Sequence, residues 1–466
     1  MNSSTVYLDK LELENFRCFS KIEIKFHEKL TVIVARNGGG KTTVLDAACF
    51  GWQFFLQGIE LEPKSAKTIR DADVRRTRSQ DGAMVPMKPV SLSGRSFIAD
   101  ESVEWNVDKG QTSAKNTSSR AAKDMREAGR VLRIATQDYA EQKSPSPPPP
   151  TLPAIGYYGT GRLWAAQKIT MSRRKKVKAD NSPISGYDQC LSPSFHFAIF
   201  EVWFERYSRE AQQERMSEKH SPHRPGDKLK AVVNAVDALL KPVGWHSLAF
   251  DFTDETIVAE HPIHGRLPVS MLSDGIRVII GLVGDIAHRC VRLNPHFGAD
   301  AAKLTPGVIM IDEVDMHLHP EWQQLILGAL TDAFPLIQFI ITTHSPQVLT
   351  TVKRESIRVL AQDEDGNWSA AMPDEETKGV ESATVLASVM GVDPVPNVPE
   401  AAELSRYRQM IQLRQQESVD AKDLRQKLDA HFGPRHHLML DCDRMIRLAQ
   451  FKAKLPMTFP SNGTGE

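Results

Sequence analysis

The stretch Leu30-Thr31-Val32-Ile33-Val34-Ala35-Arg36-Asn37-Gly38-Gly39-Gly40-Lys41-Thr42-Thr43 decides the fold class. It begins with apolar and β-branched residues, passes through a glycine cluster, and leads into Lys41 to Phe55, where apolar residues recur at helical spacing. This order predicts a buried strand, a glycine-rich loop and a helix, which together form a phosphate-binding loop. Because Ala35 replaces the first glycine of the GxxxxGK[ST] pattern, an ordinary glycine turn before a helix is the alternative.

The loop is expected to bind phosphate through backbone N–H groups at the positive end of the helix. We predict that Lys41 holds the β- and γ-phosphates and that the Thr42 hydroxyl is a magnesium ligand. The predicted nucleotide-binding residues of this segment are Arg36, Asn37, Gly38, Gly39, Gly40, Lys41, Thr42 and Thr43.

Two further apolar runs lead into residues that suit the same chemistry. The run 308–311 is followed by Asp312, a predicted magnesium contact, and Glu313, the predicted general base that activates water. The run 340–342 leads to His344, which is predicted to contact the γ-phosphate and to position the water. In the alternative interpretation, these residues simply end two buried strands, and His344 is structural.

A fourth segment, Leu272-Ser273-Asp274-Gly275-Ile276-Arg277, precedes an apolar helix predicted for residues 278–288. Taken alone, it is an ordinary helix start with Ser273 or Asp274 as the N-cap. Its position between the glycine loop and the Asp-Glu strand favours a nucleotide contact by Ser273, Asp274 and Gly275 instead.

In this order, the four motifs resemble those of ABC-type ATPases. The opening Leu11-Glu12-Leu13-Glu14-Asn15-Phe16-Arg17-Cys18-Phe19 is similar to the SMC, RecF and OLD branch, and residues 312–320 resemble the Walker B and D-loop of OLD-type proteins. The resemblance implies an α/β fold, an ABC ATPase head with a parallel P-loop NTPase sheet and antiparallel N-terminal strands. It also implies ATP and Mg²⁺ as cofactors. Two heads, or a larger oligomer, would pair so that Ser273 and Gly275 of one copy cap the ATP of the other.

Three more phrases, at residues 155–164, 186–191 and 395–399, are similar to the ATPase subunits of bacterial Septu anti-phage systems. This resemblance implies an ATP-hydrolysing sensor or regulatory subunit that controls a separate HNH-type nuclease. A RecF-like DNA-repair ATPase that binds DNA directly is the alternative. We expect no nuclease site in this chain, because Asp441-Cys442-Asp443 and His436-His437 lie in sequence that predicts surface helix.

Composition narrows the class of protein. The 58 basic and 58 acidic residues cancel, so any nucleic-acid contact has to use a local patch. One candidate is the cluster Arg173, Arg174, Lys175, Lys176 and Lys178, for which a solvated loop is the alternative. Five scattered cysteines without a CxxC pair favour a reducing compartment. We therefore expect a cytoplasmic protein without a membrane segment.

The chain is expected to have four regions. Residues 1–160 are the first part of the head with a variable polar insertion, 161–260 a largely helical insertion, 261–398 the rest of the head, and 399–466 a C-terminal helical module broken at Gly433-Pro434. In the polar stretch we expect strand fragments such as Ser96 to Asp108, joined by mobile loops. Neither Gln53 nor Gln111 suits the role of a Q-loop glutamine. The other predicted helices are Ser194 to Glu218, Lys228 to Leu240 and Glu321 to Phe334.

Overall fold

The computed structural model describes residues 5–59, 68–110, 117–118, 122–141, 148–162, 182–193, 197–216 and 225–454. The chain divides into two compact units, residues 1–390 and 391–466. Each unit has a hydrophobic core of its own. Among the described residues, no helix is both long and apolar enough to cross a bilayer.

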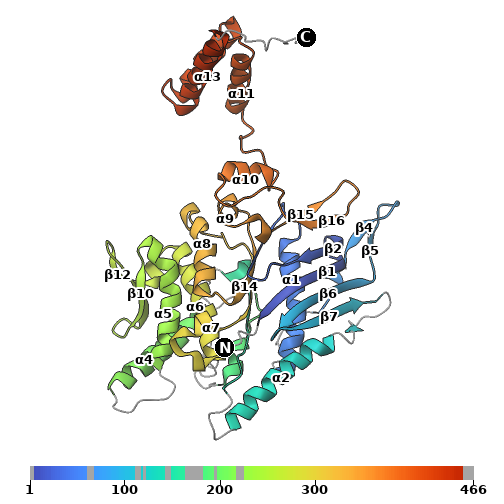
Figure 1. The fold of residues 1–466 in the computed structure, drawn as a ribbon, viewed down its shortest axis with the longest axis vertical. Coiled ribbons are helices and arrows are strands. Elements are labelled where there is room, and N and C mark those ends of the chain that lie inside the picture. Colours follow the sequence, from blue (N-terminus) through green and yellow to red (C-terminus); the bar gives the residue numbers. More distant parts are fainter. Residues whose placement is uncertain are drawn as a thin grey trace, which may run out of the picture. The chain divides into compact units, whose positions relative to one another are not determined.

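A six-stranded sheet forms the centre of the first unit (Figure 1). Five of its strands are parallel, and β16 is antiparallel at one edge. The apolar runs that precede the glycine loop, the Asp-Glu pair and His344 are its inner strands. They are buried because both faces of the sheet are covered. In sheet order the strands are β16 (Trp368–Ala371), β15 (Ile357–Gln362), β3 (Leu30–Val34), β14 (Ile337–Thr342), β13 (Gly307–Ile311) and β9 (Ala154–Tyr158).

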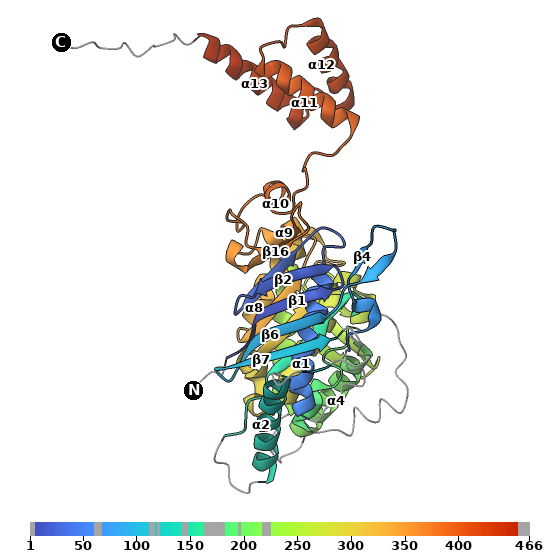
Figure 2. The same cartoon turned by 90° about the vertical axis from the view of Figure 1, so that its right-hand side faces the viewer.

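An antiparallel sheet lies beside it, and helix α1 (Lys41–Gly58) packs between the two sheets (Figure 2). Helix α1 contacts β6 and β7 on one side and β9 and β14 on the other, so it is buried around most of its circumference. The α/β fold class predicted from the sequence is confirmed. In sheet order the antiparallel strands are β2 (Phe19–Lys25), β1 (Val6–Phe16), β6 (Val90–Ile98), β7 (Glu101–Lys109) and β8 (Thr117–Ser118).

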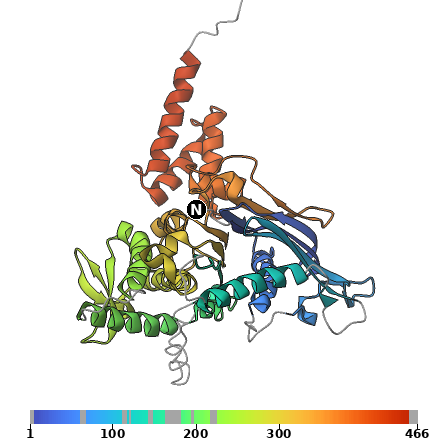
Figure 3. The same cartoon turned by 60° about the horizontal axis from the view of Figure 1, so that its bottom comes forward.

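The prediction for the polar stretch was wrong in two respects. The segment Ser96 to Asp108 is divided between two long strands, β6 and β7, at a turn where Ala99 and Asp100 both have positive φ. These strands belong to the sheet of the head. Between β7 and β9 lies an unpredicted helix, α2 (Ala122–Glu141), which packs on α1 (Figure 3).

The α1–α2 contact explains why the pattern of large apolar residues did not reveal α2. A Cβ atom at Gly58 would lie 2.0 Å from the Arg126 carbonyl oxygen, and one at Gly129 would lie 2.1 Å from that of Phe55. The two backbones therefore meet where neither helix has a side chain. A short hairpin, β4 (Arg76–Arg78) and β5 (Met84–Pro86), also lies in the polar stretch.

The remaining helices of the first unit cover the other side of the parallel sheet. The predicted helical segments are confirmed within a few residues, and the aromatic side chains of Phe200, Trp203 and Phe204 on α4 are buried in the core. These helices are α4 (Phe197–Met216), α5 (Pro225–Leu240), α6 (Asp274–Leu293), α7 (Ala301–Leu304), α8 (Pro320–Ala333), α9 (Pro346–Leu349) and α10 (Ser382–Ser388), with a small sheet of β10 (His246–Asp251), β11 (Thr256–His261) and β12 (Gly265–Pro268).

The second unit is helical. Its described helices are α11 (Pro399–Gln412), α12 (Val419–Phe432) and α13 (His437–Lys454). The predicted break at Gly433-Pro434 separates α12 from α13, and an unpredicted break separates α11 from α12. Buried Leu404, Tyr407, Leu428 and Met439 form its core.

Candidate nucleotide-binding site

The glycine loop connects β3 to α1 at the carboxyl edge of the parallel sheet. Gly38 and Gly40 have φ values of +77° and +85°, which favour glycine. A Cβ atom at Gly40 would also lie 2.3 Å from the Phe19 ring, so a side chain there would displace the β1–β2 turn from the loop. The backbone of the loop thus depends on glycine both for its conformation and for its packing.

The structure also explains how Ala35 replaces the usual first glycine. Ala35 is not among the residues with positive φ, and its methyl group is buried. A Cβ atom at Gly39 would lie 2.7 Å from that methyl group. The space that Ala35 uses is available because residue 39 has no side chain.

Helix α1 begins without a side-chain cap. Its N-cap is Gly40 in the left-handed conformation, and no side-chain hydrogen bond satisfies the first turn. The N–H groups of Lys41, Thr42 and Thr43 belong to the first turn of a helix, where no intrahelical acceptor exists. Such a helix start binds anions.

The Lys41 ammonium group is buried at this loop. Its Nζ donates to the Ala35 carbonyl oxygen at 3.2 Å, and the residue is 7% exposed. Burial lowers the pKa of Lys41, while the negative charges of Glu313 and Asp312 oppose that shift. The cation is therefore held close to the acidic end of β13, where a phosphate group would compensate its charge.

The first turn of α1 and the end of β13 bring the predicted magnesium ligands together, and the end of β14 adds Thr342 beside them. Thr42 Oγ1 donates to Asp312 Oδ2 at 2.8 Å, and Thr342 Oγ1 donates to Asp312 Oδ1 at 2.6 Å. Asp312 is 2% exposed. Hydroxyl and carboxylate oxygens are the donors that Mg²⁺ prefers, so Thr42 and Asp312 fit this ion by chemistry and by proximity.

Glu313 leaves strand β13 in an unusual conformation. Its φ is +49°, and its backbone N–H donates to Thr342 Oγ1 at 2.8 Å. A positive φ at a non-glycine residue is uncommon and needs support from its surroundings. Here Thr342 supplies that support, since it bonds both Asp312 and Glu313. The sequence interpretation gave Thr342 no role.

The predicted histidine lies at the end of the neighbouring strand. Asp315 accepts from Thr343 Oγ1 at 2.5 Å and from the His344 backbone N–H at 3.4 Å. Ser345 caps helix α9 and donates to Gln323 Oε1 at 2.6 Å. The half-buried His344 is therefore held between two carboxyl-edge loops, beside the segment that begins with Glu313.

The segment 272–277 starts helix α6. Ser273 occupies the N-cap position, but its side chain makes no capping hydrogen bond, and Asp274 pairs with Arg277. The capping interpretation thus lacks its main interaction, while Ser273 stays exposed. A Cβ atom at Gly275 would lie 2.7 Å from the His317 carbonyl oxygen, so the segment lies against the loop that follows Glu313.

Two charged networks near the site were not predicted. In the first, Arg17 donates to Asp46 Oδ2 at 2.8 Å and to Asp73 Oδ1 at 2.9 Å. Asp46 lies one turn after Thr42 in α1. The quoted sequence motif contains Arg17, but its acidic partners lie in segments distant from it, and nothing in the local pattern identifies them.

The second network joins β9 to helix α6. The Tyr158 hydroxyl donates to Asp285 Oδ2 at 2.7 Å, and Arg289 Nε donates to the same oxygen at 2.8 Å. Arg289 also donates to the carbonyl oxygens of Gly186 and Asp188. The Tyr158 carbonyl oxygen in turn accepts from the Asp312 N–H at 2.8 Å. Two of the Septu-like phrases, 155–164 and 186–191, therefore meet at α6 beside the Walker B strand.

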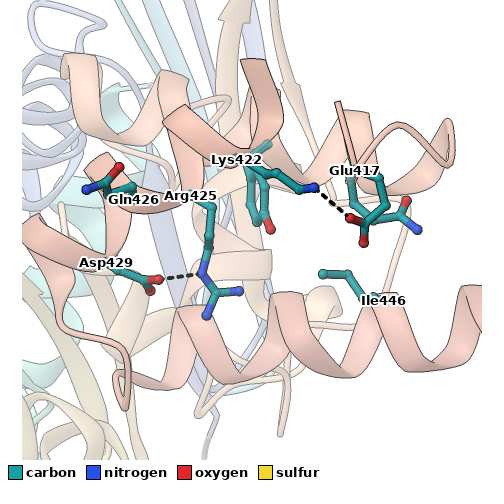
Figure 4. Close-up of a pocket in the computed structure, with 8 residues that line it drawn as sticks. Glu417, Lys422, Arg425, Gln426, Asp429 and Ile446 are labelled. Carbon is teal, nitrogen blue, oxygen red and sulfur yellow. Dashed lines mark hydrogen bonds and ion pairs between the residues drawn. The ribbon is translucent and has the colours of Figure 1, made fainter. Parts of the chain in front are cut away.

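The second unit contains a surface pocket of about 370 Å³ (Figure 4). Arg425 projects into it and pairs with Asp429 and with Asp443. Asp443 of α13 is thus paired with Arg425 of α12, and Asp441 is exposed on α13. No residue predicted for nucleotide binding lines this pocket.

Several predicted residues lie outside the described part of the chain. These include the cluster Arg173, Arg174, Lys175, Lys176 and Lys178, and also Gln111, Leu163 and Trp164. Gln53 is 5% exposed within α1. The sequence thus leaves the Q-loop glutamine unassigned. The strand β9 ends beside Asp312, and the exposed Thr160 follows at that edge.

Two family models match this chain. Residues 10–230 match an "AAA domain", and residues 209–350 match an "AAA domain, putative AbiEii toxin, Type IV TA system". A solved SMC head domain from Thermotoga maritima is similar at a TM-score of 0.43 and 15% identity, covering 79% of this chain and 99% of that chain. The fold assignment depends on the strand order described above.

Curated relatives add a second comparison. The Retron Vc95 probable ATPase of Vibrio cholerae is 22% identical, covering 93% of this chain and 88% of the relative. The Retron Ec83 probable ATPase of Escherichia coli is 36% identical over 36% of this chain and 30% of the relative. The Septu protein PtuA of Bacillus mycoides is 35% identical over 24% of this chain and 16% of the relative, so the match spans a small part of that protein. By its motifs, its strand order and these relatives, the chain resembles ATPases of the SMC, RecF and OLD type and the Septu protein PtuA.

Proposed function

We propose that this protein binds ATP with Mg²⁺ at the edge formed by β3, β13 and β14 and hydrolyses it there. The single observation that carries the proposal is the contact of Thr42 with Asp312 beside the buried ammonium of Lys41. Lys41 and the N–H groups of the loop would hold the phosphates, and Thr42 and Asp312 the metal. Bound Mg²⁺ would neutralise charge on the β- and γ-phosphates.

Glu313 is the proposed general base, and His344 the residue that contacts the γ-phosphate. The support is positional, since both follow the ends of neighbouring parallel strands, where ligands bind in such sheets. A base has to lie within hydrogen-bond reach of the attacking water. The positive φ of Glu313 directs the chain sharply away from β13 next to the Mg²⁺ ligands.

The site is proposed to be completed by a second copy of the chain. Ser273 and Gly275 of the partner would cap the γ-phosphate, with Asp274 beside them. The support is that Ser273 is exposed and does not cap its own helix.

The cellular role that we propose is anti-phage defence in the cytoplasm. The chain would be the ATP-dependent sensor that controls a separate HNH-type nuclease. The support is the likeness to two retron ATPases and to Septu PtuA. A nucleic-acid contact by residues 173–178 also remains a proposal.

Co-expression of the tagged chain with the product of the neighbouring gene tests this role. We expect an HNH protein to co-purify, and plasmid cleavage by the complex to differ between ATP and ADP. Glu313→Gln should fix the complex in its ATP-bound behaviour. Cleavage that is identical with both nucleotides, or no HNH protein encoded beside the gene, would contradict the proposal.

A further inference from the structure

The hairpin β4–β5 carries a concentrated positive charge in a chain whose charges cancel overall. Residues 75–89 contain four basic residues and one acidic residue. The acidic residue, Asp81, accepts a hydrogen bond from Ser79 in the turn. Arg76 and Arg78 are exposed, and within the described part of the chain neither forms a direct ion pair with a carboxylate. Asp71 is the acidic group that interacts electrostatically with Arg76, and it is itself paired with Lys109.

The register of the hairpin puts these charges on one face. Arg76 pairs with Pro86 and Arg78 with Met84, and residues directly opposite each other in an antiparallel pair share a face. Met84 is 57% exposed. Side chains two residues apart on a strand lie about 6.8 Å apart. Arg76 and Arg78 are therefore spaced to contact successive phosphates. The face thus combines cations with apolar groups that can pack against sugars.

We propose that this face of the β4–β5 hairpin binds the phosphate backbone of a nucleic acid. Arginine suits phosphate because its planar donors can bind two oxygens at once. The positive charge of this face favours contacts with the phosphate backbone, which are independent of base sequence. The inference does not rest on the proposed nuclease partner.

Hydrogen bonds at both ends attach the hairpin to the antiparallel sheet. The Arg75 N–H donates to the Asn15 carbonyl oxygen at 2.9 Å, and the Asn15 side chain donates to the Pro89 carbonyl oxygen at 2.9 Å. Both ends of the hairpin are therefore attached to Asn15 at the end of β1, while its tip stands out from the antiparallel sheet (Figures 1 and 2). A surface that is fixed in this way loses little conformational entropy on binding.

The neighbouring turn between β1 and β2 also contacts the glycine loop and helix α1. Arg17 of the β1–β2 turn pairs with Asp73, just before the hairpin, and with Asp46 in α1. Phe19, the first residue of β2, lies against Gly40, where an added Cβ atom would come within 2.3 Å of its ring. The two ion pairs of Arg17 therefore connect the base of the hairpin to α1, the helix proposed to bind ATP.

The test compares Arg76→Ser/Arg78→Ser with the matched control Lys25→Ser/Lys353→Ser, whose side chains are also exposed. Both are made in the full chain and again in a background with residues 173, 174, 175, 176 and 178 changed to serine. Anisotropy of a fluorescein-labelled mixed-sequence DNA duplex gives the affinity across a salt series. The hairpin variant should bind about tenfold more weakly, and its log–log salt slope should become shallower by about 1.8, the value for two phosphates.

Arg76→Lys/Arg78→Lys should keep most of the salt slope, because it keeps both charges, and the control should bind like the wild type. Equal melting temperatures will show that the variants fold. An affinity and a slope of the hairpin variant equal to those of the control would overturn the proposal. The same holds if the wild type fails to bind the duplex, or if the substitution weakens binding to phosphatidylserine vesicles and not to DNA. Since no nuclease is present, these outcomes are independent of the proposed cellular role.

Discussion

Lys41 is a single residue on which the proposed site depends. Its ammonium group is buried beside Asp312 and Glu313, and its one described hydrogen-bond acceptor is a backbone carbonyl. We predict that Lys41→Ala abolishes ATP binding or weakens it strongly, because the cation aimed at the β- and γ-phosphates is lost. Isothermal titration with ATP and Mg²⁺ measures this, with the exposed Lys25→Ala as control. A folded variant with unchanged affinity would remove the loop from the site.

A second single-residue change, Glu313→Gln, separates ATP binding from ATP hydrolysis. The amide keeps the shape of the side chain but cannot accept the proton of the attacking water, so turnover should fall by roughly 10²-fold or more while ATP still binds. Phosphate release and ATP titration measure the two effects. Glu321→Gln, an exposed change at the start of α8, is the control. Turnover at the wild-type rate would give Glu313 a structural role only.

At the scale of elements, Tyr158 connects β9 to helix α6. Tyr158→Phe removes the donor to Asp285 and leaves a buried carboxylate with one fewer partner, so we expect the free energy of unfolding to fall by about 1–3 kcal/mol. Tyr187→Phe is the matched control, since Tyr187 is equally buried and its hydroxyl has no hydrogen-bond partner among the residues that the structure describes. That change should be neutral or slightly stabilising. Chemical denaturation that gives both variants the same loss would contradict the role of this network.

At the scale of the whole molecule, the proposed site is shared between two chains. Lys41→Ala and Ser273→Arg homodimers should each lose on the order of 10²-fold or more of turnover. In a random mixture about half of the dimers pair one of each, and each such dimer has one intact site. Roughly a quarter of the wild-type activity should therefore return if the sites act independently.

Mixed dimers should also bind one ATP at their intact site, which separates a shared site from strict coupling between two sites. Differently tagged chains allow the mixed dimers to be isolated. If isolated mixed dimers neither bind nor hydrolyse ATP above the homodimer background, the segment 272–277 is only a helix start.

The strand, glycine loop and helix at residues 30–55 could be predicted from the sequence, and so could the two buried strands that lead to Glu313 and His344. These features depend on local periodicity and on glycine, and both can be recognised in the sequence. The roles assigned to Lys41, Glu313 and His344 remain predictions.

Which of these strand ends lie together could not be predicted, because it depends on the tertiary fold. Thr42 bonds Asp312 across 270 residues of sequence, and Thr342 joins Asp312 to Glu313 because β14 lies between β3 and β13. Strand order is set by the packing of whole elements, which the spacing of apolar residues does not encode. The same holds for α2, whose contact with α1 depends on two glycines, and for Arg17, whose partners lie in separate segments.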